Sequence, residues 1–288
     1  MAENSAISWT THTWNPWMGC TKVSPACDGC YAEALMDKRY GKVSWGPHGE
    51  RVRTGAHTWN DPFRWNRQAE KDGTRPFVFC ASLADIFDNQ VDPLWRVDAF
   101  DVMRRTPRLV YLLLTKRPQL IVKLADAAGG LPANAAIGTT VEDQKRVDIN
   151  LPALQVAKIE TKPLFSFGSF EPLLGPISIP GAFMPDWVIS GGETDQGAHK
   201  ARPTHPDWFR SLRDQAAAAG AAFHHKQNGE WLAWGQKLEN GNENLLSFGK
   251  DPNRYQHIGG EIVSKVGKKQ SGRTIDGVTH DAFPEVSP

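Results

Sequence analysis

Residues 109–140, LVYLLLTKRPQLIVKLADAAGGLPANAAIGTT, contain the pattern that decides the fold of this chain. The run Leu109–Thr115 is apolar almost throughout, as expected for a parallel strand buried on both faces. Pro118–Ala127 has the composition of a helix, and a second apolar run, Ala135–Thr140, follows it. Strand, helix and strand in this order predict one βαβ unit of a parallel sheet.

The same alternation continues on both sides of this unit. Further strands are expected at Phe77–Ser82, Pro163–Phe170, Trp187–Gly192 and Ala222–Gln227. Further helices are expected at about Pro93–Arg105, Val141–Ala157 and Pro206–Ala219. Repeated strand–helix units predict an α/β fold, in which residues 1–229 form a partial or complete barrel of parallel strands.

Two segments do not follow the alternation. Residues 40–75 are rich in Gly, Arg and Trp and have no clear period, so we expect an irregular insertion or a lid there. Residues 230–288 are weakly periodic and rich in Gly, Asn, Asp and Lys. We expect them to form a C-terminal extension packed on the barrel.

Bulk composition limits the class of protein. The 288 residues, 40% of them hydrophobic, suffice for one large core without disulfides. The N-terminal residues lack the features of a secretory signal, and no apolar run approaches the roughly 18 residues of a membrane span. The net charge of +1 provides no global field that would attract nucleic acid. We therefore expect a cytoplasmic protein without a membrane partner.

Residues 14–33, WNPWMGCTKVSPACDGCYAE, contain three of the four cysteines. Cys20, Cys27 and Cys30 have the spacing C-x6-C-x2-C, and the surrounding Pro and Gly residues predict a loop that leads into a helix after Cys30. Cysteines clustered in an intracellular chain indicate metal or redox chemistry rather than a disulfide framework. The N-terminus of the following helix would favour thiolates and an anionic cluster.

The number of cysteines in this loop is informative. Structural zinc sites take four protein ligands, and ordinary iron–sulfur clusters usually take four cysteines. Three cysteines would leave one iron of a 4Fe–4S cluster open to another ligand. The alternative is a structural zinc loop with a fourth ligand from His12, His48 or Cys80. The strand–helix pattern favours the cluster, and Cys80, inside an apolar run, is expected to be a core residue.

Polar residues follow the predicted strands. In barrel enzymes the carboxyl ends of the strands carry the active site, although polar residues also end strands simply because loops are solvated. The candidates for a catalytic rim are Ser82, Asp85, Thr115, Lys116, Arg117, Thr139, Thr140, Glu142, Glu171, Gly191, Gly192, Glu193, Lys226 and Gln227.

With these motifs the chain resembles a widespread phage and bacterial family of unassigned function, described as three-cysteine-motif, radical-SAM-like proteins. The resemblance rests on the cysteine loop and on motifs that run in order along nearly the whole chain: SLADIFD at 82–88, LLTKRP at 113–118, SFEPLLGP at 169–176, WVISGGE at 187–193, RSLRDQ at 210–215, FHHKQNGEW at 223–231 and GRTIDG at 272–277. It implies a TIM-barrel-like fold of the radical SAM type.

The resemblance further implies a 4Fe–4S cluster on Cys20, Cys27 and Cys30, with S-adenosylmethionine (SAM) on the open iron. Such enzymes generate a 5′-deoxyadenosyl radical and take their electron from a flavodoxin- or ferredoxin-type donor. On this basis SAM binding is expected from Ser82, Asp85, Lys116, Thr139, Glu142, Glu171, Gly191, Gly192 and Glu193. The candidate catalytic residues are Glu193, Lys226 and Glu171.

Two departures from the common radical SAM pattern bear on these assignments. The first cysteine gap is longer than in C-x3-C-x2-C. The GGE motif, which often follows the second strand and binds the methionine amino group, falls here at Gly191–Glu193, on about the sixth strand. We therefore assign Ser82 and Asp85 to SAM, and Glu193 to either SAM or substrate.

The substrate is expected to be a nucleobase or nucleotide that is rearranged or functionalised by an isomerase, mutase or lyase reaction. The family context indicates a phage protein and DNA modification, and Trp and Arg residues interleaved in 40–75 offer base stacking. Two alternatives stay open: a zinc-stabilised nucleic-acid-binding or adaptor module, and a radical SAM enzyme acting on a non-nucleotide small molecule.

Overall fold

A computed structural model describes residues 3–245 and 254–286. Seven parallel strands form one sheet in the order β1-β4-β5-β6-β7-β8-β9. Their bounds are His12–Thr13, Phe77–Cys80, Val110–Thr115, Ala135–Thr140, Ser166–Phe170, Trp187–Gly191 and Ala222–Gln227. Strands β1 and β9 are the two edges, so the sheet is a partial (βα) barrel, and the predicted α/β fold is confirmed.

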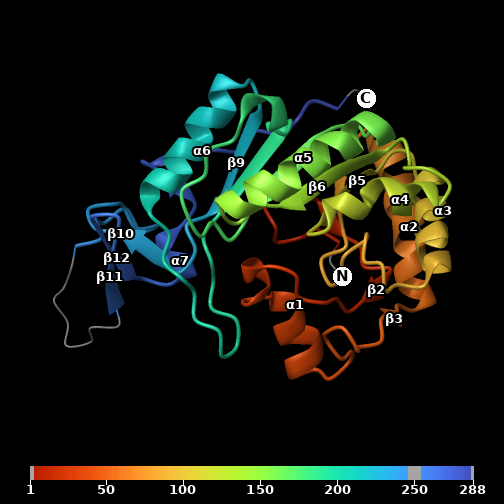
Figure 1. Ribbon diagram of the computed structural model, residues 1–288, viewed down its shortest axis with the longest axis horizontal. Helices are drawn as coiled ribbons and strands as arrows, with labels where there is room; N and C mark the ends of the chain where they lie inside the picture. The colour runs from red at the N-terminus through yellow and green to blue at the C-terminus, as the bar shows by residue number, and fades with distance from the viewer. Residues whose placement is uncertain (1–2, 246–253, 287–288) are drawn as a thin grey trace.

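Helices connect consecutive strands and cover the outer face of the sheet (Figure 1). They are α3 (Pro93–Arg104), η3 (Pro118–Leu120) with α4 (Ile121–Asp126), α5 (Gln144–Thr161) and α6 (Pro206–Ala218). Helix α5 begins three residues later than predicted. The Asp143 side chain accepts a hydrogen bond from the Arg146 amide and caps the helix, while the Val141 amide still donates to Ser169 of β7.

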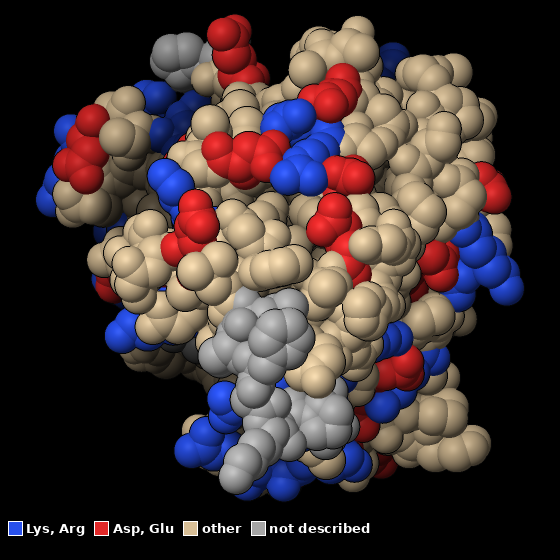
Figure 2. Space-filling model, turned by 90° about the vertical axis from the view of Figure 1, so that its left-hand side faces the viewer, with Lys and Arg blue, Asp and Glu red and all other residues tan. Residues whose placement is uncertain are grey.

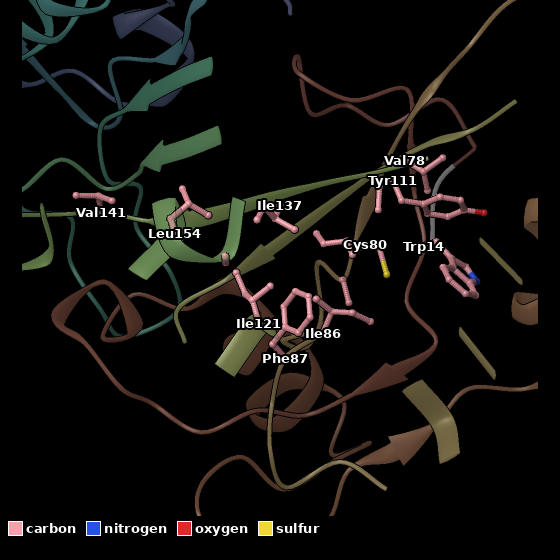
Figure 3. Packing of buried hydrophobic residues seen from close by; sticks show 14 of the residues in the cluster. Trp14, Val78, Cys80, Ile86, Phe87, Tyr111, Ile121, Ile137, Val141 and Leu154 are labelled. Carbon is pink, nitrogen blue, oxygen red and sulfur yellow. The ribbon is translucent and has the colours of Figure 1, made fainter. Parts of the chain in front are cut away.

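Both faces of the sheet are buried, which explains why its strands are apolar without alternation. Tyr111 and Leu113 of β5 belong to the core between the sheet and the helices, together with Trp14 and Cys80 (Figure 3). Val110 and Leu112 of the same strand face the inner core. That inner core also contains Trp9, Phe79, Phe167, Trp187 and Ile189.

The segment 40–75 differs from the expected irregular insertion. Strand β3 (Val52–Arg53) pairs with β2 (Trp17–Met18), and α2 spans Ala56–Asp72. The expectation is therefore wrong for residues 56–72. Pro62 inside this helix and the polar Asp61 on its buried face, beside Trp65 and Ala69, disguise the helical period.

The C-terminal segment forms a small antiparallel sheet in the order β10 (Trp231–Ala233), β12 (Glu261–Lys265), β11 (Tyr255–Ile258). Helix α7 (Lys268–Ser271) and the hairpin of β13 (Thr274–Ile275) and β14 (Val278–Thr279) follow. Ile275 is buried in the main core, so this hairpin packs on the barrel.

The face on the left of Figure 1 carries interspersed acidic and basic side chains (Figure 2). Arg210, for example, pairs with Asp207 and Asp276. Among the described residues, no helix combines the length and the apolar character that crossing a bilayer requires.

Candidate active site

A cavity of about 240 Å³ lies at the carboxyl ends of the strands. Its lining includes all three cysteines of the loop and residues at or directly after the carboxyl ends of six strands, β4 to β9. Of the predicted residues it brings together Cys20, Cys27, Cys30, Ser82, Asp85, Lys116, Glu171, Gly192, Glu193 and Lys226. Thr139, Glu142 and Gly191 do not line it: the first two are buried beside it, and a side chain at Gly191 would press on Glu171.

The cysteine loop is anchored to the strand ends by hydrogen bonds. After the short helix η1 (Pro25–Cys27), α1 (Tyr31–Glu33) continues into the π-helix η2 (Ala34–Arg39). The Tyr31 hydroxyl donates to the Ser82 carbonyl at 2.7 Å. The Ala26 amide donates to Glu142 Oε1 at 3.2 Å. These bonds direct the loop over the cavity.

Arg117 contacts the first cysteine. Its Nη1 lies 3.6 Å from Cys20 Sγ, and its Nη2 donates to the Thr21 carbonyl at 3.0 Å. Asp85 holds this guanidinium at 2.8 Å and also accepts from the Lys116 and Phe87 amides. Both oxygens of Asp85 are therefore engaged by the protein. Burial raises the pKa of Cys20 to about 11; Asp85 adds to the rise and Arg117 opposes it.

Lys116 lies in a different environment from its neighbour Arg117. Within the described part of the chain, its ammonium group makes neither a hydrogen bond nor an ion pair. Burial lowers its pKa, but Cys27, Cys30, Glu142 and Cys20 raise it by more, so the pKa lies above its ordinary value. A half-buried cation that shares a cavity with three thiols complements thiolates or an anionic cluster.

Glu142 and Glu171 occupy equivalent positions on adjacent strands. Each lies two residues after a member of the register pair Thr140–Ser169. Glu171 Oε2 accepts from Lys226 Nζ at 2.6 Å, and Arg146 lies 3.8 Å from Glu142 Oε1. Glu142 Oε2 and Glu171 Oε1 are buried without a hydrogen-bond partner. Unsatisfied buried acceptors at a cavity fit a ligand that donates hydrogen bonds.

The donor set decides which group the loop suits. In residues 3–245 and 254–286, no three His, Cys, Asp or Glu side chains come close enough to hold a single metal ion. Of the proposed fourth zinc ligands, His12 stacks on Trp65 at 4.4 Å and Cys80 is buried in the core (Figure 3). His48 is exposed and does not line the cavity. Three thiols around an open cavity fit a 4Fe–4S cluster with one free position.

The roles of some site residues were not predicted from the sequence. Arg117 is expected at a strand end, but only the fold reveals that it reaches back to Cys20. Tyr31, Trp45, Trp9 and Phe79 also line the cavity. Their ring character is visible in the sequence, whereas their convergence on one cavity is not.

The partial parallel barrel with three cysteines at its rim defines an α/β-barrel protein with a cysteine-lined site. The chain belongs to the family described as protein of unknown function DUF5131, whose model matches residues 4–284.

Solved structures of spore photoproduct lyase are similar to this chain. A double mutant with bound AdoMet and dinucleoside spore photoproduct has 11% identity and a TM-score of 0.46, over 89% of this chain and 68% of that one. The lyase complexed with dinucleoside spore photoproduct has 9% identity and a TM-score of 0.45, over 92% and 71%. A likeness of this degree says nothing about activity. No curated protein matches the sequence.

Proposed function

We propose that this protein is a radical SAM enzyme that holds a 4Fe–4S cluster with Cys20, Cys27 and Cys30. One observation carries the proposal: three thiols open onto one cavity, and the Lys116 ammonium and the buried Glu171 Oε1 on its lining lack a partner among the described residues. When bound, the cluster and SAM supply a 5′-deoxyadenosyl radical. The protein binds and orients the reactants.

The residues at the strand ends have different roles in binding and orienting the reactants. Lys116 complements the charge of the thiolates and of the SAM carboxylate, and Glu171 accepts hydrogen bonds from SAM or substrate. Ser82 lies next to the loop, where its hydroxyl accepts from Asn15 Nδ2 at 3.0 Å. Asp85 acts through Arg117, and Glu142 through the Ala26 amide. Gly192 forms part of the cavity wall that would face SAM, and Thr139 and Gly191 would support this wall from behind.

The aromatic lining supports a planar substrate, a nucleobase or nucleotide. Trp9 is the buried ring of this lining, at 2% exposure, whereas Tyr31 is 41% exposed. Trp45 lies on the same lining. Rings at different depths can stack on a base without selecting its sequence. Lys226, whose ammonium group pairs with Glu171 Oε2, is the candidate group for substrate contact, because both oxygens of Glu193 accept from Arg202.

The reaction that this arrangement suits is a rearrangement, bond cleavage or C–H functionalisation of the base. An isomerase, mutase or lyase reaction would fit the role of a phage protein in DNA modification. The electron would come from a donor of the flavodoxin or ferredoxin type. Cytoplasmic location goes with this proposal, because an intact 4Fe–4S cluster and reduced thiols require a reducing compartment.

The test is formation of 5′-deoxyadenosine from SAM by anaerobically reconstituted protein after reduction with dithionite. We expect product with the wild type and with Cys80→Ala, whose thiol lies in the core, and none with Cys27→Ala. Nucleosides and short oligonucleotides should increase the yield, and Trp45→Ala should reduce that increase. An iron-loaded wild type that forms no 5′-deoxyadenosine would refute the proposal. Stimulation by other small molecules alone would remove the nucleobase part.

A further inference from the structure

The GGE motif at the end of β8 permits two chain segments to cross at close range. A Cβ atom at Gly192 would lie 2.0 Å from the Asn228 carbonyl oxygen. A Cβ at Gly229, where φ is +87°, would lie 2.4 Å from the Glu193 carbonyl oxygen. The Gly192 amide donates to Gln227, and the Glu230 amide donates to Glu193. Glycine is required at both positions because any side chain would separate these segments.

Glu193 of this motif is fully engaged by a neighbouring loop. Its Oε2 accepts from the Arg202 amide and from Arg202 Nε, both at 2.8 Å, and its Oε1 accepts from Nη2 at 2.6 Å. His199 Nε2 lies 3.0 Å from Oε1. Burial raises the pKa of this carboxyl, but the Arg202 contacts lower it by more, so the pKa lies below its usual value.

Arg202 also reaches the cysteine loop. Its Nη2 donates to the Pro25 carbonyl at 3.0 Å, and its Nη1 lies 3.4 Å from Asp28 Oδ2. Gly29 packs directly on the same group: a Cβ there would lie 2.7 Å from His199 Cδ2 and 3.0 Å from Glu193 Oε1. Glu193, His199 and Arg202 therefore contact the segment that carries Cys27 and Cys30.

The loop 194–202 is fixed on its other side by the C-terminal sheet. Lys265 of β12 contacts both oxygens of Asp195, at 2.7 and 2.8 Å, and the Trp231 indole donates to the Ala201 carbonyl at 2.8 Å. In Figure 1 the loop that follows β8 hangs between the β10–β12 sheet on the left and α1. One loop thus connects the C-terminal extension to the cysteine loop.

We propose that Glu193 and Arg202 are positioning residues that hold the Cys27–Cys30 segment in place, and that the C-terminal extension acts on this segment through the loop 194–202. Among the described residues, the Arg202 side chain makes hydrogen bonds and ion pairs only with Glu193, whose charge it balances, and with Pro25 and Asp28 of the cysteine loop. The role in cluster binding rests on the proposed function, whereas the ordering of the segment does not.

The first experiment uses the metal-free protein. Alkylation rates of Cys27 and Cys30 by iodoacetamide are measured by peptide mass spectrometry in wild type, Arg202→Gln and Arg202→Lys. The matched control is Arg210→Gln. Arg210 lies on α6, away from the cysteine loop, and pairs with Asp276. We expect a rise of roughly fivefold for Arg202→Gln through local opening, partial restoration with Lys, and no change in the control. Lys265→Met should produce a smaller rise.

The second experiment measures iron per chain and the EPR line shape after anaerobic reconstitution. Arg202→Gln should bind less iron or give an altered signal at an unchanged melting temperature, which a merely stabilising role would not do. Unchanged alkylation rates and an unchanged signal would overturn the proposal. If wild type binds no iron while the alkylation rates still rise, the proposed function fails and the ordering role stands.

Discussion

Two groups of buried charged residues lie near the cysteine loop, and they differ in how completely they are paired. In the first group, Arg51 and Asp88 form an ion pair at 2.7 Å with side-chain exposures of 2% and 0%. Arg51 also donates to the carbonyls of Gly46 and Gly49, and Arg96 donates to those of Ile86 and Asp88. Every charge in this group has partners within the protein.

The second group consists of Lys116, Glu142 and Glu171. Lys116 makes no hydrogen bond or ion pair with the described residues, and each glutamate retains one buried oxygen without a donor. Buried polar groups that lack partners reduce stability unless a ligand satisfies them. The first group therefore stabilises the segment 44–51, whereas the second group is arranged to bind a ligand.

The largest effect is expected at the paired group. Asp88→Asn leaves the charge of Arg51 buried without its counter-ion, which should lower the free energy of unfolding by about 3–5 kcal/mol. Denaturant unfolding of the metal-free protein measures this. Asp98→Asn, in the exposed pair with Arg53, is the control and should change stability by about 0–1 kcal/mol. Equal effects of the two variants would contradict the claim that the buried pair stabilises the protein.

The unpaired group should respond in the opposite way. Lys116→Met removes a half-buried charge that has no partner among the described residues, so the metal-free protein should keep or gain stability. The iron-loaded variant should bind SAM at least tenfold more weakly, about 1.4 kcal/mol. Calorimetry and SAM titration measure the two quantities, with the exposed Lys123→Met as control. If the metal-free variant were destabilised and bound SAM normally, Lys116 would stabilise the fold in the way that the first group does.

A third buried polar group, at His225, has partners within the protein, and its effect on stability should depend on pH. His225 is buried between Ser190 Oγ at 2.8 Å and Asn228 Oδ1 at 3.1 Å. Burial lowers its pKa from 6.5 to about 3, against the opposing effect of Asn228. The unfolded state therefore binds more protons between these values. The contribution of His225 to the free energy of unfolding should be fully present above about pH 6.5. It should fall as the pH drops, by up to about 1.4 kcal/mol per pH unit.

Urea unfolding at several pH values between 7.5 and 4 tests this, with His225→Asn as the comparison. The variant should have a lower stability at neutral pH and a shallower pH dependence. The same slope in both proteins would mean that His225 is not responsible for it.

The fold was largely predictable because its strands are buried on both faces. Ala135–Thr140 and Ala222–Gln227 have the bounds expected from their apolar runs. Helix α2 was missed because its buried face includes Asp61 and Pro62 beside the apolar Trp65 and Ala69. Periodicity reports burial only where buried positions are apolar.

The residues of the candidate site could be predicted from the sequence, but most of the contacts between them could not. The spacing of Cys20, Cys27 and Cys30 indicates one loop, and the strand ends indicate one rim. That Asp85 is engaged by Arg117, and Glu193 by Arg202, depends on loops whose paths follow no periodic pattern. These paths are determined by tertiary contacts between residues as distant as Pro25 and Arg202.

The most direct test of the central claim is iron, sulfide and zinc analysis of anaerobically purified protein, with EPR spectra of the reduced protein before and after SAM is added. The account predicts about four irons per chain and a signal that changes with SAM, because three thiols leave one iron open. Zinc without iron, together with no response to SAM, would contradict it.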